Sequence, residues 1–240
     1  MTGPTRQPPE PEATALYGDA QAEAACGLAP PSLRVMQAAG AIRAAKEPKE
    51  HGGFRRMWPE ADVLKAAIGS AMGEHFAWNI RVVAEAIAKT RPGTWDASIG
   101  IATADMEETK DRTRLVTASE QDWFLDLIDR KFLFLRVPEI ATALLPDAGY
   151  GQTDLLLGFV TSKDSFQMLP WLLGTRAGRA QIERLVGKDK SEAARLTYRI
   201  AMAAHGNCLS RASINVGMQV RAAWRRLHGL EARFIQEAIR

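Results

Sequence analysis

The sequence predicts a mainly α-helical protein with a smaller β component, an α+β fold. Apolar residues recur every three or four positions along most of the chain, which is the spacing of the buried face of a helix. Residues 43–58 instead form a basic stretch with a glycine pair, and residues 123–161 contain apolar runs separated by turn residues, which indicates short strands in both. A composition of 46% hydrophobic and 25% charged residues over 240 positions is typical of a globular chain and excludes collagen-like, fully disordered and membrane-spanning classes.

The first forty residues predict a tail and two short helices. Residues 1–14 contain four prolines and almost no large apolar side chain, so a disordered tail is expected. A first helix is predicted over residues 19–25 and a second over residues 30–39, with Gly27 as the break between them. Proline is well accommodated in a first helical turn, and Gly40 is a typical residue just after a helix.

The next segment predicts a basic hairpin followed by helical sequence. The glycine pair at positions 52–53 lies between two extended runs, which is a hairpin signal. A helix is predicted to begin near residue 60, and the helical pattern continues over residues 62–90 until a Pro-Gly pair stops it. Residues 95–110 are expected to form a linker.

Residues 123–137 fit two alternative secondary structures. Phenylalanine and leucine alternate at positions 132–135 after a turn at 129–131, which favours a hairpin, whereas Ser119 and Asp122 resemble a helix capping box. The hairpin is the preferred alternative. A strand is also predicted over residues 154–161, and helices are predicted over residues 166–173, 177–186, 191–204 and 213–227, with Gly206 and Gly229 as stop signals.

Basic residues are concentrated in two segments. The net charge of +3 includes six basic against two acidic side chains in residues 26–58 and eleven against five in residues 181–240, on either side of an acidic middle. Such segments are where a polyanion is expected to bind. The last predicted helix carries Arg221, Arg225 and Arg226, and we expect a packing helix with a solvated basic face. The alternatives are that this basic face contacts DNA, an acidic partner or the acidic middle of the chain.

Residues 17–72 carry the pattern of a known DNA-binding family. YGDAQAEAACGLAPPSLRVMQAAGAI contains a first helix, a glycine turn, a proline or serine start to a second helix and a Leu-Arg pair; GGFRRMWPEADVLKAAI adds a basic hairpin and a third helix. This order resembles the winged helix-turn-helix of the MerR family. The resemblance implies a DNA-binding domain at residues 15–72, a connecting or dimerisation helix at 73–93, and a mostly helical C-terminal effector or oligomerisation domain with a small β element at 94–240. A core helix packed on its own chain is the alternative for 73–93.

The candidate DNA-binding residues lie on the second helix and on the hairpin. A helix fits the major groove of B-DNA with its N-terminal residues at the base edges, while a basic hairpin beside it reaches the backbone or the minor groove. The resemblance implies that Arg34 and Arg55 hold phosphates, and Gln37 is a candidate base reader. The predicted DNA-binding set is Pro31, Ser32, Arg34, Gln37, Arg43, Lys46, Lys49, His51, Arg55 and Arg56.

Three positions depart from the family pattern. Val35 and Met36 follow the Leu-Arg pair where the family has aromatic residues, and Met57 stands in place of a tyrosine, so hydroxyl contacts to the DNA backbone are lost. Trp58 is a candidate substitute for them. The preferred alternative is that Phe54 and Trp58 only pack the hairpin onto the helices.

No pattern in the sequence predicts an enzyme, a metal site or a cofactor. Nucleophile-elbow, phosphate-loop and dinucleotide motifs do not occur. His205 and Cys208 are too few for a metal site and resemble a helix end. The carboxylates Asp122, Asp126 and Asp129 are expected on a solvated face rather than in acid-base catalysis.

The predicted function is that of a bacterial sequence-specific transcriptional regulator that binds double-stranded DNA as a homodimer. A protein partner, RNA polymerase or a recombinase, is expected to contact the C-terminal domain. Two alternatives are a phage or mobile-element DNA-processing factor, such as an excisionase or small terminase subunit, and a ligand-sensing regulator with a pocket in the C-terminal domain. No apolar run of about 18–20 residues occurs, so no membrane contact and a cytoplasmic, nucleoid-associated location are expected.

Overall fold

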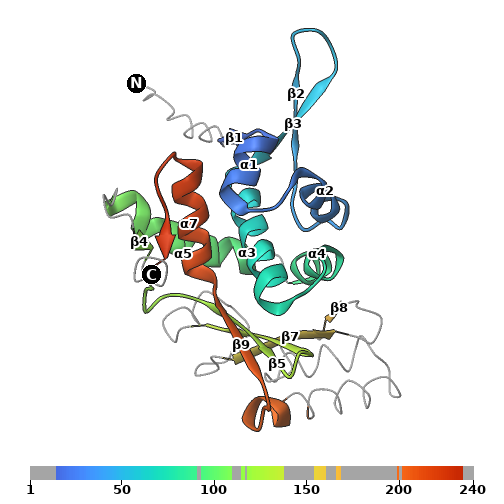
Figure 1. Cartoon of the computed structure of the whole chain (residues 1–240), viewed down its shortest axis with the longest axis vertical. Helices are drawn as coiled ribbons and strands as arrows, with labels where there is room; N and C mark the ends of the chain where they lie inside the picture. The colour runs from blue at the N-terminus through green and yellow to red at the C-terminus, as the bar shows by residue number, and fades with distance from the viewer. Residues whose placement is uncertain are drawn as a thin grey trace, which may run out of the picture.

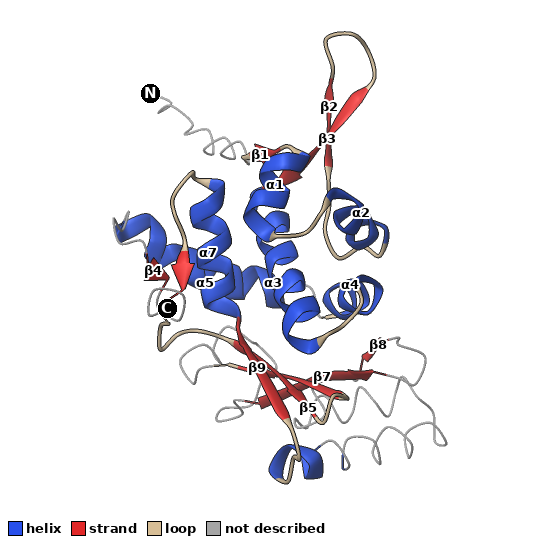
Figure 2. Ribbon diagram, in the orientation of Figure 1, coloured by secondary structure: helices blue, strands red, loops and turns tan. Residues whose placement is uncertain are grey.

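A computed structural model of the chain shows helices and strands in two layers (Figure 1). It describes residues 15–90, 93–109, 115–116, 118–137, 154–160, 166–168, 199 and 202–234. Helices form one layer, and a five-stranded antiparallel sheet lies against it (Figure 2). This mixture is compatible with the predicted α+β class. The predicted disordered tail, residues 1–14, lies outside the described residues.

The N-terminal elements follow the predicted order. They are β1 (Leu16–Tyr17), α1 (Asp19–Cys26), α2 (Pro30–Ala38), β2 (Ala45–Pro48), β3 (Phe54–Pro59) and α3 (Glu60–Phe76). Gly27 ends α1 in the left-handed conformation, with φ 76°, and its amide donates to the Glu23 carbonyl. β3 pairs antiparallel with β2 on one side and with β1 on the other, so the hairpin is anchored next to the start of α1.

The helical pattern over residues 62–90 is not one helix. A second helix, α4 (Ile80–Lys89), begins after Ala77, which has a left-handed φ of 54°. The Asn79 side-chain oxygen caps α4 by accepting hydrogen bonds from two backbone amides of its first turn, at 3.0 and 3.1 Å. The apolar residues of α4 are buried within the same chain, as the core-helix alternative requires. The expectation of a single long helix was wrong because the apolar spacing continues unbroken through the turn.

The expected linker at residues 95–110 is also wrong, because this segment is a helix, α5 (Thr94–Thr109). One face of α5 packs into the core, with residues spaced by four and three positions: Trp95, Ile99, Ala102 and Met106. The signal was present in the sequence, but Gly100 and three threonines, which are poor helix formers, obscured it.

The sheet is larger than the small β element that was expected. Its strands are β5 (Phe124–Ile128), β6 (Phe132–Arg136), β7 (Asp154–Val160), β8 (Phe166–Met168) and β9 (Arg211–Asn215), in the order β8-β7-β6-β5-β9. The preferred hairpin at residues 123–137 and the strand at 154–161 are confirmed. A separate short parallel pair joins β4 (Leu115–Val116) to β10 (Arg233–Phe234).

Two predicted helices begin as strands instead. Residues 166–168 form β8, and residues 211–215 form β9 before α7 (Val216–Leu227) begins. A short apolar run fits either structure, and here pairing with a neighbouring strand decides it. The predicted helix at 177–186 lies outside the described residues. Of the predicted helix at 191–204, the described positions 199 and 202–204 are helical.

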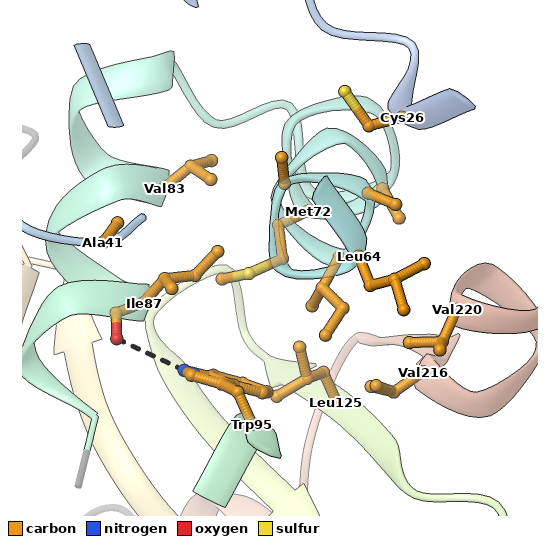
Figure 3. Close-up of a cluster of buried hydrophobic side chains, with 14 of the residues drawn as sticks. Cys26, Ala41, Leu64, Met72, Val83, Ile87, Trp95, Leu125, Val216 and Val220 are labelled. Atoms are coloured by element: carbon orange, nitrogen blue, oxygen red, sulfur yellow. Dashed lines mark hydrogen bonds between the residues drawn. The ribbon is translucent and has the colours of Figure 1, made fainter. Parts of the chain in front are cut away.

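One hydrophobic core joins the two layers. α7 packs against α1, α3 and α5, and α4 lies next to β8. Figure 3 shows Leu64 of α3, Leu125 of the sheet and Val220 of α7 in the same buried cluster. The indole N–H of Trp95 in this cluster donates to the Ile87 carbonyl at 3.2 Å. None of the described helices is long and apolar enough to cross a membrane.

Two of the three arginines of α7, Arg221 and Arg225, are buried rather than solvated, contrary to expectation, whereas Arg226 is exposed. Arg221 and Arg225 are 6% and 4% exposed. Arg221 donates to both carboxylate oxygens of Asp122, at 2.7 and 2.8 Å, and Arg225 Nε donates to the Glu231 carbonyl at 2.8 Å. For Arg221, contact with the acidic middle of the chain is therefore the alternative that is confirmed.

The three carboxylates that were expected on a solvated face instead hold the sheet together. Asp122 accepts hydrogen bonds from the Arg221 guanidinium. Asp126 is fully buried and accepts a hydrogen bond from Arg136 Nε at 3.3 Å. Asp129 Oδ1 accepts hydrogen bonds from two backbone amides just before β9, at 2.9 and 2.8 Å. The expectation failed because most of these partners lie far away in the sequence.

The two cysteines differ in burial, which predicts a selective reaction. Both thiols are free; Cys26 is 4% exposed, and burial raises its pKa to about 11, whereas Cys208 is partly exposed. Because the thiolate is the reactive form, a thiol reagent at about pH 8 is expected to modify Cys208 in the folded protein and Cys26 only on unfolding. Mass spectrometry before and after adding denaturant checks this, with Cys208→Ser as the control. Rapid modification of both thiols in the folded protein would contradict the burial of Cys26.

Candidate nucleic-acid interface

A groove of about 660 Å³ lies between α2, the start of α1 and the β2–β3 hairpin. The hairpin projects from the helical layer on the side away from the sheet (Figure 1). Half of the predicted DNA-binding set lines the groove: Gln37, Lys46, Lys49, Arg55 and Arg56. The fold therefore brings together, at one surface, side chains from α2 and from both hairpin strands.

The hairpin places two cations directly opposite each other. Its register pairs Lys46 with Arg56, and Glu47 with Arg55. Opposed like charges destabilise a hairpin. The second pair is neutralised, because Arg55 Nε donates to the Glu47 carboxylate, and this hydrogen bond lowers the pKa of Glu47. The Lys46–Arg56 pair has no such partner within the hairpin register, and a bound polyanion would relieve its repulsion.

The start of α2 carries the other predicted contacts, outside the groove lining. Arg34 is exposed and is the only charged side chain of α2, while Ser32 is half-buried. Pro30 and Pro31 occupy the first two helical positions. Neither proline has an N–H group, so a contact by Pro31 is limited to its ring and its carbonyl oxygen.

Arg43 and His51 are not brought to the groove. Arg43 lines a separate polar pocket of about 150 Å³, together with Asp62, Lys65 and Asp96. Burial is the main cause that raises the pKa of Asp62, and hydrogen bonding to the Arg43 backbone opposes it. Arg43 therefore lies among carboxylates rather than beside the other predicted cations. His51 is exposed in the loop that joins the hairpin strands.

Phe54 and Trp58 have different surroundings. Trp58 is 1% exposed, its Nε1 donates to Asp19 Oδ1 at 2.7 Å, and Arg56 lies over its ring at 5.8 Å. The prediction that Trp58 packs the hairpin onto the helices is confirmed. Because its indole N–H already donates to Asp19, Trp58 does not replace the missing hydroxyl contacts to DNA. Phe54 is 64% exposed opposite Pro48, so the expectation that it packs onto the helices was wrong. The hairpin extends beyond the helices at this point, and the neighbouring glycine pair was the signal that could have shown it.

Within the described ranges, no group of three or more His, Cys, Asp and Glu side chains is placed to hold a metal ion. The ring of His205 instead packs against Phe134, with ring centroids 4.7 Å apart. Comparison of the chain with protein-family models, with characterised proteins and with solved structures finds no match.

Proposed function

We propose that the chain is a sequence-specific double-stranded DNA-binding protein, in the manner of a winged helix-turn-helix transcriptional regulator. In this proposal α2 enters the major groove, and the β2–β3 hairpin follows the adjacent backbone or minor groove. The observation that carries the proposal is the opposed Lys46–Arg56 pair in the groove beside α2. Arg34, exposed on α2, supplies the charge of that helix.

The order of elements supports the resemblance to the MerR domain. A helix, a glycine turn, a second helix, a basic hairpin and a third helix follow one another over residues 16–76. Because the apolar face of α4 is buried within the chain, a homodimer would need a different surface.

Selection of bound fragments from random double-stranded DNA tests the proposal. We expect an enriched motif, and an inverted repeat within it would indicate that two copies bind. Footprinting on the parent genome then separates a regulator, which protects sites beside promoters, from a DNA-processing factor, which protects attachment or packaging sites. Failure to enrich any motif would refute sequence-specific binding.

Lys46→Ala and Arg56→Ala are each expected to weaken binding to all DNA sequences. Each change removes one phosphate contact, so the slope of log K against log salt should become less steep by about one unit. Lys46→Ala also removes a like-charge repulsion, so it should not weaken the fold, whereas Arg56→Ala also removes the guanidinium that lies over the Trp58 ring and is expected to cost about 0.5–1 kcal/mol. Fluorescence anisotropy titrations at several salt concentrations measure the slope. Lys131→Ala, which removes an exposed cation of the sheet, is the control; if the slope responds equally to all three changes, the assignment is wrong.

Phe54→Ser is expected to weaken DNA binding without changing stability. An exposed aromatic side chain on a cationic hairpin is suited to stacking on or between bases, and the loss of one such contact corresponds to roughly 5- to 100-fold in affinity. Anisotropy and thermal unfolding measure the two effects. Leu209→Ser removes another exposed apolar side chain, 98% exposed and remote from the hairpin, and should leave affinity unchanged.

A further inference from the structure

The turn between α3 and α4 lies next to the sheet (Figure 1), and residues of both line a second hollow. Its volume is about 500 Å³, within the usual range of small-molecule sites. Phe76 and Leu127 form its buried lining, and Trp78 and Val160 are half-buried beside them. The rings of Phe76 and Trp78 meet edge to face, with centroids 5.4 Å apart. The hollow therefore has an aromatic and apolar interior.

The ionisable side chains in the described lining of this hollow are all basic. His75, Arg130 and Arg211 are exposed lining residues, and the described lining contains no acidic side chain. Arg211 Nη2 donates to the His205 carbonyl at 3.3 Å, which orients the guanidinium without neutralising its charge. Asp129, adjacent to Arg130, has its carboxylate bound to two backbone amides. Positive charge thus surrounds an aromatic interior.

Strained backbone borders the same hollow. Ala77, Asp129 and Arg130 have φ values of 54°, 50° and 56°, and they are the non-glycine residues with positive φ in the described part of the chain. Ala77 and Arg130 line the hollow. Glycine would relieve the strain at Arg130, which is the second central residue of a turn with positive φ at both central positions. The turn between β5 and β6 requires positive φ values at its two central positions, so the hairpin fixes where Arg130 stands at the rim of the hollow.

We propose that this hollow binds a small aromatic carboxylate. The ring packs against Trp78 and the apolar interior, and the carboxylate accepts hydrogen bonds from Arg130 and Arg211, whose planar guanidinium groups match it. The proposal goes beyond DNA binding and does not depend on it. The hairpin precedes α3 and the hollow follows its end, so the whole 17-residue helix separates the two surfaces.

Titration of the isotope-labelled full-length chain with naphthoate, followed by NMR, tests the proposal. Saturable shifts are expected for the Trp78 indole N–H and the Ala212 amide, both at the hollow. Naphthamide has nearly the same shape but no charge, and it is expected to bind about tenfold more weakly or worse, because a charge-assisted hydrogen bond is lost.

Arg130→Gly removes a positive charge from the hollow without weakening the fold, so it tests the role of that charge in binding. Glycine fits the left-handed turn, so the variant should unfold at the same denaturant concentration or a higher one. Its affinity for naphthoate should nevertheless fall about tenfold or more. Lys131→Ala, which removes the neighbouring cation outside the lining, should bind naphthoate as the unmodified chain does.

Three results would overturn the proposal. The first is equal affinity of the unmodified chain and Arg130→Gly for naphthoate. The second is equal affinity for naphthoate and naphthamide. The third is the absence of shifts at Trp78 and Ala212 up to the solubility limit of naphthoate. Because none of these measurements involves DNA, failure here is distinguishable from failure of the proposed function.

Discussion

Replacing Asp122 with alanine is expected to lower the free energy of unfolding by about 3–5 kcal/mol. The substitution takes from Arg221, whose side chain is 7% exposed, the carboxylate that it contacts at 2.7 and 2.8 Å. It also removes the acceptor of the Asn215 side-chain amide and of the Ser119 backbone amide. The guanidinium then stays buried without the Asp122 carboxylate and loses that attraction while it remains desolvated, so the native state is weakened.

Chemical denaturation followed by tryptophan fluorescence measures this loss. Asp96→Ala is the matched control, because Asp96 also forms an ion pair at 2.7 Å, with Lys65, but its side chain is 58% exposed. Removing this exposed pair should change stability by at most about 1 kcal/mol. If Asp122→Ala cost no more than Asp96→Ala, the Asp122–Arg221 pair would not be buried in solution.

Gly217→Ala is expected to destabilise the protein by about 2–4 kcal/mol, although alanine favours a helix over glycine by about 1 kcal/mol. Gly217 lies in the first turn of α7, where an added methyl carbon would be 2.6 Å from Asp122 Cγ and 3.1 Å from Arg221 Nη1. The carboxylate must move, and the buried ion pair is disrupted with it. Glycine is therefore the only residue that fits at position 217.

The same unfolding measurement tests Gly217→Ala against a helical glycine with free space. Gly100→Ala in α5 is the control, since a methyl group there meets nothing within 4 Å. It should gain up to about 1 kcal/mol from helix propensity. If both variants were equally stable, the close approach of Asp122 to α7 would be contradicted.

The N-terminal elements could be predicted because residues with special backbone preferences mark their ends. Gly27 and Gly40 follow two helices with positive φ, and the glycine pair at 52–53 lies between two strands. The end of α3 has no such mark, because Ala77 adopts a left-handed conformation that its side chain does not favour.

The residues of the candidate interface could be predicted by their type and segment but not by their placement. Lys46, Arg55 and Arg56 line the groove, because the register of the hairpin places Lys46 beside Arg56 and the hairpin itself lies next to α2. Arg43 does not, since the chain turns toward Asp62 before β2 begins. The pairing of Asp122 with Arg221 could not be predicted, because 99 positions separate the two residues and burial alone makes their attraction strong.

The position of α7 affects how the protein folds during synthesis. α7 packs on α1 and α3, and Arg226 donates to the Ala25 carbonyl at 3.3 Å, a contact between residues 201 positions apart. Until residues 216–227 leave the ribosome, α1 lacks one of the two helices, α3 and α7, against which it packs, and Ala22 and Ala25 are only partly covered. The N-terminal end, although translated first, therefore completes its folding only after α7 has emerged, and nascent chains carry exposed apolar surface until then.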